Sequence, residues 1–422
     1  MNPTVTRHAP DTTIEPSGAG KTAVTAAPQV WSLGRPSGTY TIRNVRAVLP
    51  DRLVDNASVF VRDGRIDGIT EGGRNDSADV DGADLLLTPG LIDVHSDALE
   101  KERAPRANAE VPLDFAMASF EGRTVSAGIT TMFHGAGFQH QLARGVERSV
   151  ERALETCGVV DGTASYRVDH RVLHRLDILS EGGAATLARR LEGLPWSAAE
   201  APPLVSHEDH TPGQGQYADV QGMKNTLIRA DGLSEAEAEE RVARLIAEGQ
   251  ANARIREDNL EWLGRLAAEG RIRLLGHDPD TAQAIDDLHA RAGSVAEFPT
   301  TIEAAQRARE LGMLIVAGAP NAVRGQSHSG NVSVAALAAA GLIDALASDY
   351  MPTSLLAGVH VLVGRGLLTL PEGISLITSG PAAVGGLDDR GVIAEGMLAD
   401  FALIDDSIGA WPRVVTTLKA QP

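Results

Sequence analysis

The sequence is poor in cysteine, with Cys157 the only one among 422 residues. This excludes an intrachain disulfide, and a chain of this length can bury a core large enough to fold without one. We therefore expect a reducing, cytoplasmic location. No stretch approaches the roughly 20 apolar residues that a membrane-spanning helix needs, so we expect no association with a membrane.

Basic residues are also scarce, because 38 Lys and Arg stand against 56 Asp and Glu, giving a net charge of −18. This balance disfavours partners such as nucleic acid or anionic membrane surfaces. It does not exclude a small anionic substrate, since bound metals or a local basic patch can reverse the field inside one cleft. Residues 1–39 are rich in Pro, Thr, Ser, Ala and Gly and lack the pattern of a signal peptide, so we expect a disordered tail.

Short strands are predicted at both ends of the remaining chain. In residues 40–84 apolar and polar residues alternate, and Asp63-Gly64 is typical of a hairpin turn. Residues 387–422 again have the pattern of short strands. We predict that the two segments form one small β domain.

Between these segments, residues 85–386 alternate apolar strands with helical stretches. Such alternation predicts βα units and, with eight strands, an α/β fold of the (β/α)₈ TIM-barrel type. A helical excursion is expected at 220–270, where Ser234 and Glu237 form a capping box. The eight predicted strands are 85–95, 129–135, 165–178, 202–210, 271–278, 294–300, 313–320 and 345–350.

Polar residues recur at the carboxyl ends of these strands, where (β/α)₈ barrels place their reactive groups. A lone His at a strand end is more often structural than a ligand, but seven of the 12 His fall at or near such ends. Imidazole and carboxylate together suit zinc, manganese or iron, so we expect a divalent metal site, most simply for zinc, with one or two ions. The strand-end residues are His95, Asp97, His170, His174, Asp209, His210, His277, Asp278, Glu297 and Asp349.

Several segments resemble one family of the amidohydrolase superfamily, the alpha-D-ribose 1-methylphosphonate 5-triphosphate diphosphatases of the carbon–phosphorus lyase pathway. The superfamily combines a metal-bearing (β/α)₈ barrel with a small β domain built from both termini. The EFPTT segment and the GAPN–RG–SHSGN run are specific to the narrower family. The similar segments are PGLIDVHSDALEKE (89–102), DHTPGQGQY (209–217), EFPTTIEAA (297–305), GAPNAVRGQSHSGNVS (318–333) and ASDYMPTSLL (347–356).

The resemblance implies a set of metal ligands: His95, Asp97, His210, His277 and Asp349. Asp349 and His277 are the expected catalytic residues, with Asp349 accepting a proton from the attacking water. His174 and Glu297 are further candidate ligands. For Glu297 the alternative is a buried, hydrogen-bonded carboxylate. His174 lies four residues after His170, whereas the family's two histidines on this strand are three apart. A shift of one residue turns a strand side chain to the other face of the strand unless a bulge absorbs it.

Phosphate-binding residues are expected after the seventh barrel strand, where such barrels often bind phosphate. The RGQSHSGN segment offers an Arg fork, hydroxyls and backbone amides ahead of a helix. From the residues alone, a solvent-exposed polar loop is an equally good interpretation. The candidate phosphate ligands are Arg324, Ser327, His328 and Asn331, with Lys101 from the first βα loop.

The expected function is metal-dependent hydrolysis of alpha-D-ribose 1-methylphosphonate 5-triphosphate, releasing diphosphate and leaving the 5-phosphate, in phosphonate catabolism. The alternative is an amidohydrolase acting on a cyclic amide, an N-acyl compound or another phosphate ester, which would have no need of the phosphate ligands. A catalytically silent scaffold is disfavoured because such relatives typically lose metal ligands. The expected partner is a small anionic phosphorylated substrate, and a homodimer is a further hypothesis.

Overall fold

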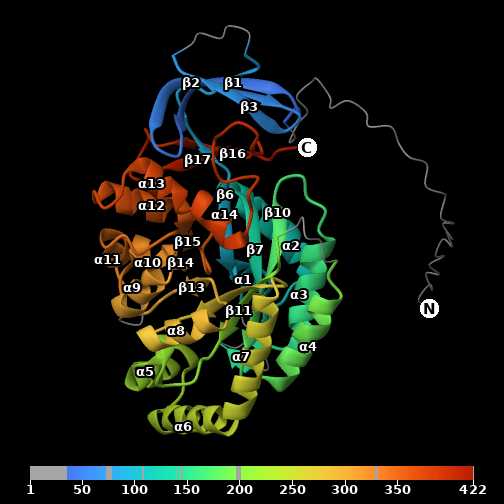
Figure 1. Ribbon diagram of the computed structural model, residues 1–422, viewed down its shortest axis with the longest axis vertical. Helices are drawn as coiled ribbons and strands as arrows, with labels where there is room; N and C mark the ends of the chain where they lie inside the picture. Colours follow the sequence, from blue (N-terminus) through green and yellow to red (C-terminus); the bar gives the residue numbers. More distant parts are fainter. Residues whose placement is uncertain are drawn as a thin grey trace, which may run out of the picture.

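The computed structural model describes residues 36–72, 78–106, 109–139, 141–143, 146–195, 201–327 and 331–421. His328, one of the candidate phosphate ligands, and nearly all of the predicted tail lie outside them. The described residues form an eight-stranded parallel barrel and a second, mixed sheet. In Figure 1 this second sheet lies at the opposite end of the molecule from the helical excursion.

The predicted (β/α)₈ barrel is confirmed. Its strands follow one another in chain order, each parallel to its neighbour. The first and last strands meet where Asp349 N donates to His95 O (2.9 Å) and Ser96 forms a parallel bridge with Asp349. The strands are β6 (Leu91–Ser96), β7 (Ile129–Phe138), β10 (Asp169–Asp177), β11 (Leu204–Glu208), β12 (Arg273–His277), β13 (Val295–Glu297), β14 (Leu314–Gly318) and β15 (Ala345–Ala347).

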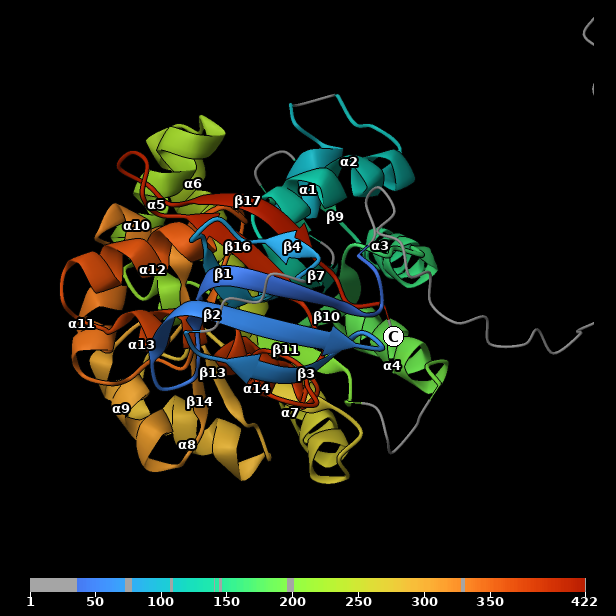
Figure 2. The ribbon, with the colours of Figure 1, turned by 90° about the horizontal axis from the view of Figure 1, so that it is seen from above.

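Helices surround the barrel (Figure 2). The predicted excursion is helical, and the Ser234–Glu237 capping box is present at the start of its second helix. A short hairpin, β8 (Gln141–Ala143) and β9 (Val146–Arg148), follows β7. The helices are α1 (Ala98–Arg103), α2 (Leu113–Ser126), α3 (Val150–Gly162), α4 (Glu181–Glu192), η1 (Gly215–Tyr217), α5 (Val220–Asp231), α6 (Glu235–Ala251), α7 (Ala253–Ala268), α8 (Ala282–Ala290), α9 (Ile302–Glu310), α10 (Ala319–Arg324), α11 (Val334–Ala339), α12 (Ser354–Gly364), α13 (Leu370–Ser375) and α14 (Ser379–Gly385).

Strands from both ends of the chain build the second sheet, as predicted. Asp63 and Gly64 both have positive φ (51° and 72°), the geometry of the expected hairpin between the second and third strands. The order is β17-β16-β5-β1-β2-β3, with β4 also on β1. The strands are β1 (Tyr40–Val48), β2 (Leu53–Arg62), β3 (Arg65–Thr70), β4 (Val80–Asp81), β5 (Leu86–Pro89), β16 (Phe401–Asp405) and β17 (Arg413–Leu418).

One predicted strand is wrong. Residues 85–95 form two strands, because β5 pairs with β1 and β16 in the second sheet whereas β6 pairs with β7 in the barrel. The chain passes from one sheet to the other at Gly90, whose backbone N–H donates to Asp400 O (2.8 Å). A Cβ there would lie 2.3 Å from Thr130 Oγ1, so the crossing requires glycine.

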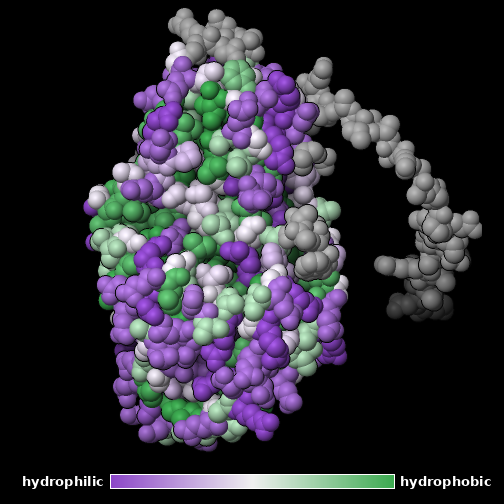
Figure 3. All heavy atoms as spheres, in the orientation of Figure 1, coloured by the Kyte–Doolittle hydropathy of each residue, from purple (hydrophilic) through white to green (hydrophobic). Residues whose placement is uncertain are grey.

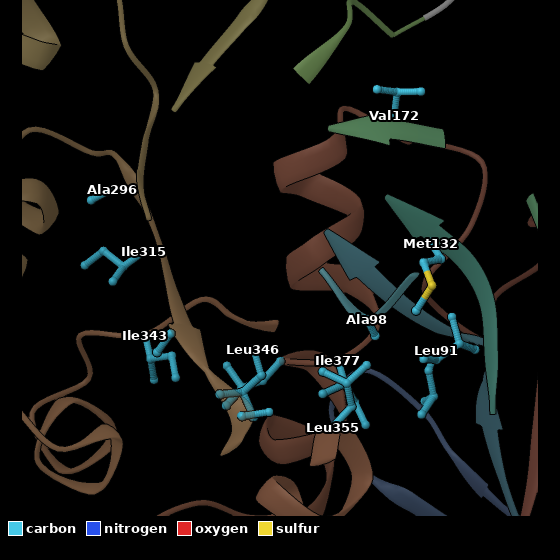
Figure 4. Close-up of a cluster of buried hydrophobic side chains, with 14 of the residues drawn as sticks. Leu91, Ala98, Met132, Val172, Ala296, Ile315, Ile343, Leu346, Leu355 and Ile377 are labelled. Carbon is cyan, nitrogen blue, oxygen red and sulfur yellow. The ribbon is translucent and has the colours of Figure 1, made fainter. Parts of the chain in front are cut away.

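Strand alternation divides the barrel core into two layers. Side chains that point inward fill the barrel, among them Leu173, Leu204 and Leu275. Their neighbours along each strand point outward and pack against the helices. Figure 4 shows part of this outer layer, including Met132 and Leu346. Hydrophilic residues cover most of the face seen in Figure 3, and no described helix is long and apolar enough to cross a membrane.

Candidate metal centre

On β12 and β13 the polar residues of the centre continue the inward-facing rows of the strands. On β12, Leu275 lies in the inner core and His277, two residues later, points to the same side. On β13, Glu297 follows Val295 in the same way. A strand period of two therefore places an apolar layer below and a polar layer above, at the carboxyl ends of the strands.

Glu297 joins two of the histidines. Its side chain is fully buried, and its two oxygens accept hydrogen bonds from His95 Nδ1 (2.7 Å) and His277 Nδ1 (2.8 Å). Ser206 Oγ donates a third bond to it (2.6 Å). A carboxylate only accepts, so both imidazoles carry a proton on Nδ1, and Nε2 is the nitrogen that remains to bind a metal. This is the arrangement in which a carboxylate orients metal-ligating histidines.

The free ring nitrogens face carboxylates in two groups. One group is His95, Asp97 and Asp349, and the other is His210, His277 and Asp278; within each, the ligand atoms lie within 4.8 Å of one another. Asp278 Oδ2 is buried without a hydrogen-bond partner, 3.4 Å from His277 Nε2. A desolvated carboxylate oxygen of this kind needs a cation or a proton, and the imidazole–carboxylate set fits zinc, manganese or iron. The residues present therefore fit a divalent metal in each group.

Backbone conformation at the mouth is unusual in three places. Asp278, Phe298 and Asp349, each one or two residues past the end of a barrel strand, have φ values of 53°, 55° and 56°. Non-glycine residues adopt this left-handed region rarely and at some energetic cost. Each nevertheless donates its backbone N–H to the neighbouring strand, Asp278 to Glu297 O (2.8 Å) for example. At these positions the backbone conformation fixes the directions of two candidate ligands, Asp278 and Asp349.

A buried arginine borders the centre. Arg175 on β10 forms short ion pairs with both Asp97 and Glu208, and all three side chains are largely buried. Gly135 on β7 gives them room, since a Cβ there would lie 2.4 Å from Asp97 Oδ1 and 3.0 Å from Arg175 Cδ. The Arg175 guanidinium thus pairs with two carboxylates. One of them, Asp97, is also a member of the first metal group.

Burial and neighbouring charges set the protonation states. Burial lowers the pKa of His277, but Asp278, Glu208 and Glu297 outweigh it and raise that pKa to about 10. Burial raises the pKa of Asp278 to about 6 and, with the nearby charge of Asp97, also raises the pKa of Asp349. Burial lowers the pKa of His210 to about 4. Carboxylates with raised pKa values in a cleft are typical of functional sites, and a divalent cation would reverse this effect.

His174 is not part of the centre. It points outward from β10, where its Nδ1–H donates to Leu204 O (3.1 Å) and its Nε2 accepts from Arg190 Nε (3.4 Å). The adjacent Arg175 occupies the inward position instead, and no bulge reverses the face in the regular pairing of β10 with β7. His170 also lies outside the barrel, 2.9 Å from His134. The candidate ligand at position 174 is therefore a structural histidine.

The predicted phosphate residues are spread around the mouth. Lys101 lies on α1 with its Nζ 4.1 Å from the ring centre of Tyr350, the residue after Asp349. Asn331 precedes Val332, whose N–H donates to Thr300 O (2.9 Å) just beyond β13. Arg324 is exposed at the end of α10 and Ser327 is half-buried. Among the described residues, no hydrogen bond or ion pair joins Arg324 or Asn331 to the centre.

Two residues of the centre, Glu208 and Arg175, had no role in the sequence interpretation. Asp278 was among the predicted strand-end residues but was not in the ligand set that the resemblance implies. Glu208 and Arg175 follow the inward parity of their strands, but only the fold shows that Arg175 pairs with both Glu208 and Asp97.

Comparisons with known proteins agree with this architecture. A model of the amidohydrolase family matches residues 265–420. The chain is 35% identical over 364 residues to the alpha-D-ribose 1-methylphosphonate 5-triphosphate diphosphatase of Escherichia coli (strain K12), covering 86% of this chain and 94% of that protein. Two solved structures share the fold: an enamidase (TM-score 0.54, 16% identity, 90% of this chain and 94% of that one) and the 5-methylcytosine deaminase of Klebsiella pneumoniae (TM-score 0.53, 15% identity, 90% and 95%).

Proposed function

Because the chain belongs to the family of alpha-D-ribose 1-methylphosphonate 5-triphosphate diphosphatases, within the amidohydrolases, we propose that it hydrolyses this triphosphate to the 5-phosphate and diphosphate. The observation that carries the proposal is the pair of histidine–carboxylate groups organised by Glu297. We further propose that each group binds one divalent ion, zinc in the first place, with manganese and iron as the alternatives.

His95, Asp97 and Asp349 would hold one ion, and His210, His277 and Asp278 the other. Divalent ions held here would lower the pKa of water toward 7 and neutralise phosphoryl oxygens.

The residues divide the remaining work. Asp349, whose pKa burial and Asp97 raise, accepts a proton from the attacking water as the bond between the α- and β-phosphates breaks. Glu297 holds the two imidazoles in one tautomer throughout. Lys101, Arg324, Ser327 and Asn331 contribute cationic and hydrogen-bonding groups to the substrate's anionic oxygens.

The test is diphosphate release by zinc-loaded protein from alpha-D-ribose 1-methylphosphonate 5-triphosphate, with ATP as the comparison substrate. We expect rapid release from the phosphonate and slow release from ATP. The double variant His95→Asn, Asp349→Asn should lose at least 100-fold in rate, consistent with removal of a ligand and a base together. The double variant Asp287→Asn, His289→Asn, which makes the same changes on the exposed face of α8, should keep the wild-type rate.

Wild-type protein that holds zinc and releases diphosphate from neither substrate would contradict the proposal. In that case amides and other phosphate esters would be the substrates to screen. Full activity in the His95→Asn, Asp349→Asn variant would show that the chemistry occurs elsewhere.

A further inference from the structure

A cavity of about 50 Å³ opens beside the metal centre, between the barrel and helices α1 and α3. Asp97, a member of the first metal group, lines it together with Gly135 and Arg175. A volume this small is far below the roughly 300–1,000 Å³ of a complete small-molecule site. The cavity is therefore at most one part of a substrate site whose reacting group lies at the metals.

The lining of this cavity has more cationic than anionic side chains in a protein of net charge −18, although Arg148 is paired with Glu100 and Arg175 with Asp97. Two acidic residues, Asp97 and Glu100, line it together with four arginines. In addition, the first turn of α3 faces the cavity through Ser149, its N-cap residue, so the positive end of a 13-residue helix points inward. The arginines are Arg103, Arg148, Arg152 and Arg175.

The outer arginines are held by carboxylates that lie nearer to solvent than they do. The Arg103 side chain is 15% exposed, while its partner Glu155 (2.8 Å) is 46% exposed. Arg152 is 29% exposed and pairs with Glu110 (2.8 Å), which is 40% exposed. Ion pairs with such exposed partners are weak. Moreover, Arg103 Nε is buried and makes no hydrogen bond within the described part of the chain, so this guanidinium has a donor to spare for a ligand.

We infer that this arginine-lined cavity binds the departing diphosphate, that is, the β- and γ-phosphates of the substrate. The inference rests on the proposed function. The β-phosphate is joined to the reacting phosphoryl group by a single bridging oxygen, so it must lie next to the metal centre, as the cavity does through Asp97. The methylphosphonate end is separated from that group by the ribose. Two phosphoryl groups also match several guanidinium forks better than one does.

Binding of inorganic diphosphate to chelator-treated, full-length protein, measured by calorimetry, tests this subsite without any contribution from bound metal. We expect Arg103→Gln and Arg152→Gln each to weaken the affinity about tenfold, as for loss of one charge-assisted contact. Arg307→Gln is the matched control, because Arg307 on α9 also pairs with two carboxylates but lies away from the cavity; its affinity should equal that of the wild type. Thermal unfolding of each variant verifies the fold.

Glu110→Gln gives a test of opposite sign. Glu110 lies 2.8 Å from Arg152 and 3.7 Å from Arg103, so removing its charge frees both arginines and should tighten diphosphate binding several-fold. A purely structural role for these ion pairs would not produce tighter binding. In the zinc-loaded enzyme the same variants should change product inhibition by diphosphate in the same directions.

The inference is overturned if Arg103→Gln and Arg152→Gln bind diphosphate as the wild type does, or if Glu110→Gln weakens binding. It is also overturned if the variants change the affinity for methylphosphonate and leave diphosphate unaffected, since the cavity would then take the other end of the substrate. If the variants change diphosphate affinity as expected but the protein does not hydrolyse the triphosphate, the subsite is supported and the proposed function is rejected. If the protein hydrolyses the triphosphate but the variants do not change diphosphate affinity, the proposed function is supported and the subsite is rejected.

Discussion

Glu297 provides the sharpest test of the metal centre. Its carboxylate accepts Nδ1–H bonds from His95 (2.7 Å) and His277 (2.8 Å) at the same time. In Glu297→Gln the side chain keeps one acceptor oxygen but gains an NH₂ group. That NH₂ group opposes the Nδ1–H of one imidazole, which must move its proton to Nε2 or turn away. Either response removes one nitrogen from the metal groups.

The size of the effect follows from the number of bonds lost. A hydrogen bond to a charged group contributes about 1.5–3 kcal/mol, and one of the two histidine bonds is replaced by a donor–donor contact. Residues that orient metal-ligating histidines typically change metal affinity 10–100-fold. We therefore expect Glu297→Gln to bind zinc 10–100-fold more weakly and still to bind two equivalents. If Glu297 were itself a ligand, one equivalent would be lost altogether.

Competition between the protein and a zinc chelator measures this affinity and the number of equivalents bound. Glu303→Gln, the same change on the exposed surface of α9, serves as the control and should leave both unchanged. His277→Asn, which removes a proposed ligand, sets the scale for the loss of one equivalent. Wild-type zinc affinity in Glu297→Gln would refute the tautomer argument, provided that circular dichroism shows the variant to be folded.

Two further variants test the surroundings of the centre. Gly135→Ala places a Cβ 2.4 Å from Asp97 Oδ1, so it should displace that carboxylate and lower zinc affinity and kcat at least tenfold; wild-type affinity would show that Asp97 can move freely. His174 has its pKa lowered to about 4 by burial, against about 6.5 in the unfolded chain. The unfolded state therefore binds more protons between these values, and stability falls by about 3 kcal/mol as the pH drops from 6.5 to 4. In denaturant titrations the unfolding free energy of His174→Gln should lose this part of its pH dependence, and the variant should still bind zinc. Loss of zinc would show that His174 is a metal ligand.

The barrel was predictable because its signals are local. Each predicted strand from 129–135 onward overlaps an observed one, since apolar runs alternate with helical stretches and their caps lie in the sequence. The segment 85–95 was wrong for a physical reason. Its apolar pattern is continuous, and the change of sheet at Gly90 depends on Asp400 O and on the close approach of Thr130. Neither contact leaves a local signal.

The site was predictable to the extent that strand parity and strand ends determine it. The structure brings His95, Asp97, His210, His277 and Asp349 together in the two groups. By the same alternation His174 points outward and Arg175 points inward. The spacing of the histidines alone cannot show this. The sequence could not predict which inward-facing residues of different strands pair with one another. The register of β10, β11 and β6 brings Arg175 to Glu208 and Asp97, and that register has no local signal.

Charge explains why these parts belong together. Five largely buried carboxylates surround the centre, and two of them, Asp97 and Glu208, are compensated by Arg175. Glu297 is compensated by the imidazoles of His95 and His277. Asp278 and Asp349 remain, and burial raises the pKa of both. Two divalent ions would offset this excess and also attract a polyanion that a protein of net charge −18 otherwise repels. Binding of a triphosphate should therefore depend on metal at the centre, while the neighbouring arginines determine where its terminal phosphates lie.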